Sequence, residues 1–221
     1  MGYPAIRSYT SPNYDDDGTS TTHTIQLPAD ILAGDYIVVI FALHRDANIQ
    51  SRSITWPGGW YPFVNGVYSN ETHTFAGYII ANGTEDGSTI TITSSSGATG
   101  LWASYALYNV AAAPEGTYRS VPSLAVPEPL NPSSCTHSYG AAEYLTIEGL
   151  STQDIPITNL SSGYSGSIYS DWFGVGTSTT TSATEDPAAI SGTNYDGYST
   201  VTIMVPGIFE ANSSFFFGDN F

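Results

Sequence analysis

The chain has 221 residues, of which 41% are hydrophobic and 13% aromatic. Because all-β sandwiches of about 200–250 residues fold as one domain, we expect a single domain with a full core. Four arginines, no lysine and 20 acidic residues give a formal net charge of −16. Nucleic acids and anionic membranes attract basic surfaces, so this charge excludes both as expected partners. Cys135 is the single cysteine, so no disulfide can form within the chain.

The first segment, residues 1–22, is expected to be an arm without regular structure. Pro4, Pro12 and the run Asp15-Asp16-Asp17-Gly18 are typical of turns and loops. Residues 23–27 then alternate between polar and apolar side chains and end at a proline, which predicts a first strand.

An unbroken apolar run over residues 36–43 follows the turn-forming pair Gly34-Asp35 and stops before the polar residues 44–48. A strand with one face in water would alternate apolar with polar residues, so this run predicts a central strand covered on both faces. Its eight residues are too few to cross a bilayer, which takes about 20 residues as a helix. We expect two packed sheets around this strand.

Three further segments, 72–80, 88–93 and 101–108, predict strands. In the second of them threonines alternate with Ile90 and Ile92, which places the isoleucines on one face. None of these segments has the periodicity of a helix. The pattern predicts an all-β fold, an antiparallel β-sandwich with a jelly-roll-like path.

Residues 109–140 contain five prolines and predict a long irregular connection, because proline excludes interior strands and helices alike. This segment could join two domains, but a crossover inside a single sandwich over residues 23–206 also needs one, and we favour the crossover. Segments 142–150 and 198–206 predict later strands. The sequence of the first of these segments resembles the start of the central strand. This similarity is consistent with two halves that each contribute strands to both sheets.

Paired carboxylates are the first candidates for catalytic groups, because glycoside hydrolases use a pair of acids in one groove. Glu143 and Glu148 differ by five positions, so in a regular strand they point to opposite faces. The adjacent pairs at 85–86 and 185–186 fit solvated loops. Cys135 and His137 share a face but lie in the proline-rich connection without an oxyanion-hole motif. We expect no catalytic residues and no enzymatic activity.

The spacing of the potential ligand residues does not support a metal site either. The four histidines lack the separations that bind zinc. Calcium takes clustered carboxylates and loop carbonyls, so the run 15–17 and the loop 82–86 are candidates, although neither has EF-hand spacing. We expect no cofactor, with Ca²⁺ as the one open option.

Aromatic residues are the candidates for an interface. Trp56 and Trp60 flank a Pro-Gly-Gly turn, where they could form a sugar-binding platform, although a core or interface role is favoured. The tail 207–221 is either an exposed apolar segment or the last strand. Each phenylalanine that it buries is worth about 1.5–3 kcal/mol. The candidate interface residues are therefore Trp56, Trp60, Phe215, Phe216, Phe217 and Phe221.

A series of motifs also carries a family resemblance. In order they are Leu27-Pro28-Ala29, the Gly-Asp opening of the central strand, Trp56-Pro57-Gly58-Gly59-Trp60, the loop 81–87 before an alternating Thr-Ile strand, Trp102-Ala103, the proline-rich segment and Glu143-Tyr144-Leu145. In this order they resemble the β-sandwich virion proteins of tailed bacteriophages, particularly marine ones, which lie on capsids or tails. The apolar C-terminus departs from that pattern.

The resemblance implies a non-enzymatic virion structural protein, specifically a capsid decoration or cement protein that stabilises the head by surface contacts. It implies a location on the capsid or tail surface, with the major capsid protein or other virion proteins as partners. A homo-oligomer is expected, with a trimer as the first expectation. The alternatives are a carbohydrate-binding module and an adhesion protein associated with a tail or fibre.

Overall fold

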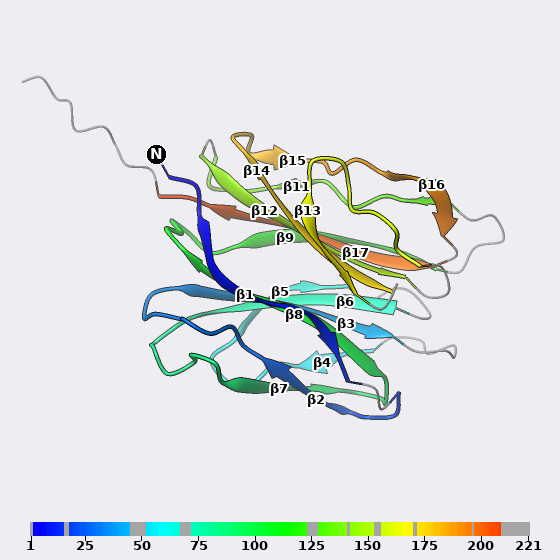
Figure 1. The fold of residues 1–221 in the computed structure, drawn as a ribbon, viewed down its shortest axis with the longest axis horizontal. Coiled ribbons are helices and arrows are strands. Elements are labelled where there is room, and N and C mark those ends of the chain that lie inside the picture. Colours follow the sequence, from blue (N-terminus) through cyan, green and yellow to red (C-terminus); the bar gives the residue numbers. More distant parts are fainter. Residues whose placement is uncertain are drawn as a thin grey trace, which may run out of the picture.

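The computed structural model describes residues 2–15, 18–44, 52–66, 72–122, 128–140, 142–152, 156–169, 172–195 and 197–208. These residues form strands and loops, and none of them lies in a helix that could cross a membrane. Antiparallel sheets stack in layers, as Figure 1 shows. The expected all-β fold with sheets packed as a sandwich is confirmed, while the jelly-roll path stays a prediction.

The layers consist of two five-stranded sheets, one three-stranded sheet and two short ribbons. The first sheet has the order β1 (Ala5–Tyr14), β8 (Thr99–Tyr108), β3 (Tyr36–His44), β6 (Thr72–Ile80) and β5 (Tyr61–Asn65). The second sheet has the order β13 (Ser165–Tyr169), β14 (Phe173–Thr180), β12 (Tyr144–Thr152), β17 (Tyr198–Pro206) and β9 (Glu115–Val121). The small sheet has the order β2 (Thr22–Gln26), β7 (Thr89–Ser94) and β4 (Ile54–Thr55). The ribbons pair β10 (Glu128–Leu130) with β16 (Ile190–Tyr195) and β11 (Cys135–Thr136) with β15 (Thr184–Glu185).

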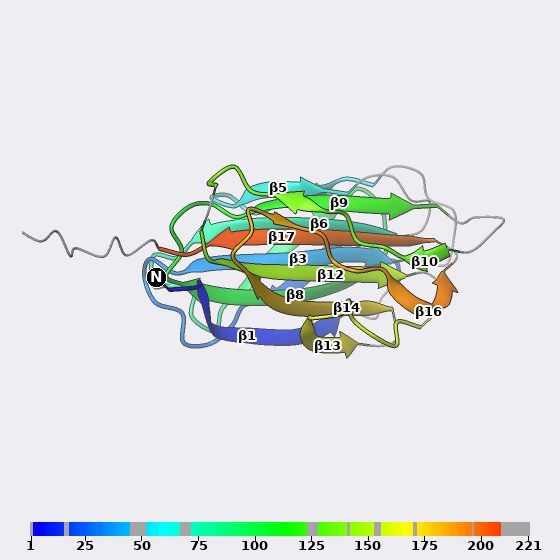
Figure 2. The same ribbon diagram turned by 90° about the horizontal axis from the view of Figure 1, so that it is seen from above.

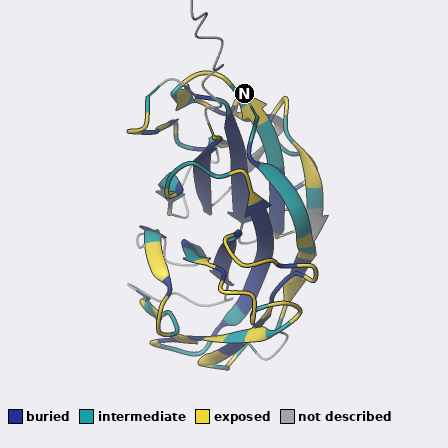
Figure 3. Cartoon of the chain, turned by 90° about the vertical axis from the view of Figure 1, so that its left-hand side faces the viewer, coloured by how far each residue is buried: buried dark blue, intermediate teal, exposed yellow. Residues whose placement is uncertain are grey.

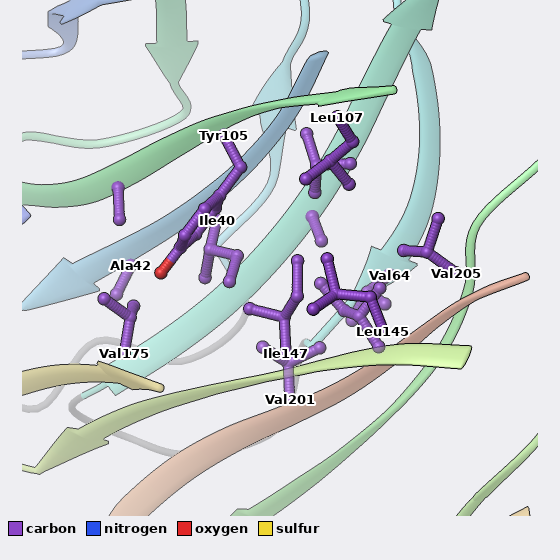
Figure 4. Close-up of a cluster of buried hydrophobic side chains, with 14 of the residues drawn as sticks. Ile40, Ala42, Val64, Tyr105, Leu107, Leu145, Ile147, Val175, Val201 and Val205 are labelled. Carbon is purple, nitrogen blue, oxygen red and sulfur yellow. The ribbon is translucent and has the colours of Figure 1, made fainter. Parts of the chain in front are cut away.

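Strand β3 occupies the centre of the first sheet and is covered on both faces, as its apolar run predicted. Val38, Ile40 and Ala42 pack between the two five-stranded sheets, together with side chains of β12 and β17 (Figure 4). The alternate residues, including Val39 and Phe41, pack under the small sheet. The expectation of two packed sheets was therefore incomplete, because the second face of β3 needs a third layer. Figure 3 shows the buried strands inside and exposed segments around them.

The two five-stranded sheets share one topology. Each has a central strand (β3 or β12) with a neighbour and an edge strand on one side (β6 and β5, or β14 and β13). On the other side lie the last strand and the first strand of that half of the chain (β8 and β1, or β17 and β9). The N-terminal half builds the first and small sheets, and the C-terminal half builds the second sheet and the ribbons. The expectation that each half contributes to both sheets is wrong, although the echo at residues 142–150 did mark equivalent central strands.

The sheets face each other so that each edge strand from one half lies beside the opposite edge strand from the other half. Figure 2 shows β1 beside β13 along one side of the molecule and β5 beside β9 along the other. Gly149 allows the sheets to pack closely, because a Cβ there would lie 2.8 Å from Ile40 Cγ2 and 2.8 Å from Val201 Cγ1. The two sides of the sandwich are therefore topologically equivalent openings onto one core.

Two segments that were expected to be irregular contain strands. Residues 3–22 include β1, which pairs with β8 along the edge of the first sheet. Only Pro12 of β1 is buried, so its polar sequence gave no apolar alternation to detect. The proline-rich segment 109–140 leads from the first sheet to the second and contains the edge strand β9 as well as β10 and β11. Prolines in this segment lie outside β9, which is compatible with backbone pairing there.

Candidate functional site

Each side of the sandwich carries a groove between the two five-stranded sheets. The groove beside β1 and β13, here the Tyr9 groove, has a volume of about 230 Å³. Its lining residues are Ile6, Tyr9, Pro12, Tyr105, Ser165, Gly166, Ser167, Val175 and Thr177. The groove beside β5 and β9, here the Tyr118 groove, has a volume of about 380 Å³. It is lined by Phe63, Val64, Asn65, Gly116, Thr117 and Tyr118.

Two bulges in β1 shape the Tyr9 groove. Ile6 pairs with Leu107 and Ser8 with Ala106, so Arg7 is an extra residue in the ladder. A second extra residue lies between Thr10 and Asn13. A regular strand would point residues three apart to opposite faces, but each bulge shifts the alternation by one. Ile6, Tyr9 and Pro12 therefore all line the same groove.

The Arg7 side chain holds the first bulge in place. Its Nε donates to Asp35 Oδ2 at 2.6 Å and its Nη2 donates to Asp35 Oδ1 at 3.1 Å. Asp35 Oδ2 also accepts from the backbone N–H of Leu32 at 2.9 Å, and the guanidinium lies 4.8 Å from the centre of the Tyr108 ring. Charged hydrogen bonds with bidentate geometry are among the stronger ones, so the bulge is fixed in the folded protein.

A stacked tyrosine pair forms the wall and floor of this groove. The rings of Tyr9 and Tyr105 have their centroids 6.1 Å apart and planes 24° apart. Tyr9 is 57% exposed, whereas Tyr105 is buried with its hydroxyl directed toward Val175 (Figure 4). Burial, and secondarily Tyr9, raises the pKa of Tyr105, so its hydroxyl stays protonated. On the opposite strand Gly166 is required, because a Cβ there would lie 2.0 Å from the carbonyl oxygen of Val175.

The Tyr118 groove repeats this arrangement with different side chains. Tyr118 projects from β9 and is 42% exposed, while the half-buried Phe63 faces it from β5. Gly116 leaves the room between the strands, since a Cβ there would lie 2.8 Å from Val64 Cγ2. Each groove therefore contains an exposed tyrosine from the first strand of one half of the chain, Tyr9 from β1 and Tyr118 from β9.

Trp56 and Trp60, expected at an interface or a sugar platform, lie against the core. Their rings stack with centroids 5.5 Å apart and planes 16° apart. Trp60 is 9% exposed and belongs to the cluster between the first sheet and the small sheet, against which Trp56 also packs. Trp56 lies over Gly77, where a Cβ would approach its ring to 2.9 Å. The two tryptophans thus connect the first sheet to the small sheet, and their stacked rings do not form a flat exposed platform. Phe215, Phe216, Phe217 and Phe221 lie outside the described residues.

Asp15, His23 and Ser94 form a hydrogen-bonded chain that resembles the acid–histidine–serine relay of hydrolases. His23 Nδ1 lies 2.5 Å from Asp15 Oδ2, and Nε2 lies 3.0 Å from Ser94 Oγ. The hydroxyl of Ser94, however, donates its single proton to the Ser96 carbonyl at 2.8 Å. His23 Nε2 must then donate to Ser94 Oγ and cannot accept a proton from it. Ser94 is also only 8% exposed, so this arrangement acts as a clamp.

The clamp ties the small sheet to the end of the first sheet. Asp15 follows β1, His23 belongs to β2 and Ser94 to β7. Asp15 Oδ1 accepts from the Gly100 N–H at 2.6 Å, which adds β8 to the connection. Sequence reasoning could not find this group, because its members are separated by up to 79 positions and carry no shared motif.

The carboxylates and the thiol considered from the sequence do not form a reactive site. Glu148 is buried on the outer face of the second sheet, and Glu143 lies before β12 begins. Cys135 is buried, and desolvation raises the pKa of its thiol to about 11, so a thiolate is disfavoured. His137 donates from Nε2 to the Ala113 carbonyl at 3.1 Å. Its Nδ1 accepts from the Tyr139 N–H at 3.0 Å, so both ring nitrogens already have hydrogen-bond partners.

The expected calcium loops use their carboxylates for the backbone. Glu85 Oε2 accepts from the three N–H groups of residues 82–84 at 3.0–3.1 Å, and Asp86 Oδ1 accepts from Ile31 N–H at 3.2 Å. Both oxygens of Asp15 are engaged in the clamp, and Asp16 and Asp17 lie outside the described residues. Within the described ranges, no group of three or more His, Cys, Asp or Glu side chains is placed to hold a metal ion.

Comparison with known proteins adds no identification. No family model, no curated protein and no solved structure matches the chain.

Proposed function

We propose that the chain is a non-enzymatic structural protein of a virus particle, a capsid decoration protein that stabilises the head by surface contacts. The observation that carries the proposal is the identity of the exposed apolar side chains. Among the described residues, six of the ten large apolar side chains at the surface are tyrosines: Tyr9, Tyr14, Tyr61, Tyr108, Tyr118 and Tyr139. The resemblance noted in the sequence supplies the virion context.

Tyrosine suits a protein that works by binding. It provides a large rigid contact area with a polar end and loses little conformational entropy when it is fixed. Tyrosine is enriched at protein interfaces, whereas lysine is depleted there, and this chain has no lysine at all. A net charge of −16 makes separate copies repel each other in solution, so assembly requires apolar contacts or a basic partner. The partners proposed are the major capsid protein, other virion proteins and further copies of this chain.

The test is the composition of purified particles. Quantitative mass spectrometry should find the protein in many copies per particle, and particles stripped of it should release their genome at lower temperature. Immunogold electron microscopy then separates a head position from a tail or fibre position. Particles that lack the protein would rule out the proposal.

The proposed homo-oligomer has its own test in the C-terminal segment. Replacing Phe215, Phe216 and Phe217 with serine should release monomers in sedimentation velocity while the β-sheet circular dichroism signal is retained. The matched control replaces Ser213 and Ser214 with alanine and should leave the oligomer intact. Unfolding of the phenylalanine variant would instead assign these residues to a strand of the same chain.

A further inference from the structure

The Tyr9 groove combines a flat aromatic wall with hydroxyl groups, and the described residues that line it include no charged side chain. The wall is the exposed face of Tyr9, whose other face stacks on Tyr105. Hydroxyls come from Tyr105, Ser165, Ser167 and Thr177, and Ile6, Pro12 and Val175 supply apolar contacts. The described lining of the Tyr118 groove is uncharged as well, but its polar groups are those of Asn65, Thr117 and Tyr118, and Phe63 instead of serine and threonine faces the ring.

We propose that the Tyr9 groove is a binding site for a neutral saccharide. One pyranose ring stacks its C–H face on the exposed face of Tyr9. Its hydroxyls exchange hydrogen bonds with the side chains of Ser165, Ser167 and Thr177 and with the Tyr105 hydroxyl. Binding sites of this kind pair aromatic and apolar surface with a few placed polar groups. The volume of about 230 Å³ suits a short stretch of one or two sugar rings, with the rest of the chain outside.

The charge distribution selects a neutral ligand. An anionic sugar would meet a net charge of −16 without a cationic partner in the groove lining. The described residues that line the groove include no carboxylate to pair with a cationic ligand. Burial raises the pKa of Tyr105, so its phenol remains a neutral donor and acceptor over the physiological range.

The shape of β1 disfavours an added peptide strand at this edge of the groove. A peptide that extends a sheet needs a regular edge with evenly placed backbone groups. The edge strand β1 instead carries two bulges within its ten residues, and bulges interrupt edge pairing. Those same bulges turn Ile6, Tyr9 and Pro12 into the groove, and the Arg7–Asp35 ion pair holds the first of them. The site is therefore preformed, which reduces the entropic cost of binding.

The test uses the full chain with defined probes. Isothermal titration calorimetry with cellohexaose, xylohexaose, mannohexaose and laminarihexaose should show saturable binding of at least one of them. An alginate oligosaccharide of similar length serves as the anionic counterpart and should not bind. Tyr9→Ala should weaken binding at least about tenfold by removing the stacking surface, whereas Tyr9→Phe should retain most of the affinity. Thr177→Val should give a smaller loss.

The control is Tyr139→Ala, which removes a comparably exposed tyrosine away from the groove. Circular dichroism verifies that each variant is folded. The proposal is overturned if none of the four neutral probes binds, if alginate binds as well, or if Tyr9→Ala and Tyr139→Ala weaken binding equally. The saccharide site is independent of the proposed structural role, so each of the two can fail without the other.

Discussion

Replacing the buried carboxyl of Glu148 with an amide should stabilise the protein as the pH rises. Glu148 is 0% exposed, on the outer face of the central strand of the second sheet. Its Oε1 accepts a hydrogen bond from Ser161 N–H at 2.9 Å, but Oε2 has no partner among the described residues. Burial raises the pKa of this carboxyl, and the nearby Glu185 raises it further.

The sign of the effect follows from proton linkage. Because the pKa of Glu148 is raised on folding, the folded protein holds this proton to higher pH than the unfolded chain does. The stability that it contributes is fully present below the unfolded pKa of about 4.3 and is lost as the pH rises through the folded pKa. Glutamine keeps the bond to Ser161 and cannot ionise. Glu148→Gln should therefore differ little from wild type in acid and become the more stable protein as the pH rises above the folded pKa of Glu148.

The magnitude follows from the charge that the wild-type carboxyl carries at high pH, because the amide of glutamine also leaves one polar atom without a described partner. Leaving a buried polar atom without a partner costs about 1–3 kcal/mol, and more when it is charged. The variant should gain about 1–3 kcal/mol, and each kcal/mol raises Tm by about 2–4 °C in a chain of this size. Urea unfolding of both proteins across a pH series measures the difference directly. Asp186→Asn removes the same charge at an exposed position and should show no such trend. A pH dependence shared by wild type and Glu148→Gln would refute the reasoning.

Four further outcomes are expected from buried positions. Phe41→Ala should destabilise the protein by about 3–5 kcal/mol in urea unfolding, since it empties the layer under the small sheet, and a loss below about 1 kcal/mol would contradict that packing. Gly149→Ala should cost about 1–3 kcal/mol by the same measurement because its methyl overlaps both sheets, and a neutral result would contradict the close approach. Cys135, with its thiol pKa raised to about 11, should react with a thiol reagent only after unfolding, and Ser94 should resist a fluorophosphonate probe in the folded protein. Rapid labelling of either residue would contradict its buried position.

The fold could be predicted where the sequence carried a strong apolar signal. The run at 36–43 is β3, and the predicted strands at 72–80 and 198–206 agree closely with β6 and β17. The same apolar run also implies the third layer. A two-sheet sandwich covers only one face of each sheet and leaves alternate residues in water, whereas this strand is apolar on both faces. The predicted two-sheet sandwich lacked the layer that covers the second face of β3.

The groove and the clamp could not be predicted, for two different physical reasons. The Tyr9 groove depends on two bulges, and a period of two residues would place Ile6, Tyr9 and Pro12 alternately on opposite faces. The clamp of Asp15, His23 and Ser94 depends on long-range packing of three strands, which single-sequence periodicity does not encode. Resemblance failed to help in either case because its motifs lie in core strands and turns, which specify a fold rather than a site.

The repeated topology explains why the two grooves lie where they do. Two open sheets packed face to face leave the core uncovered along both sides, unlike a closed barrel. On each side the first strand of one half (β1 or β9) lies beside the other half's opposite edge strand (β13 or β5). A side chain at such an opening must cover apolar core with one part and face water with another. Tyrosine meets both requirements, and Tyr9 and Tyr118 occupy these equivalent positions. The two sites then differ by what surrounds the ring: Tyr9 faces serine and threonine hydroxyls across its groove, whereas Tyr118 faces Phe63. The repeated five-stranded topology thus provides two equivalent openings, and the opening where Ser165, Ser167 and Thr177 surround the ring has the composition of the proposed sugar site.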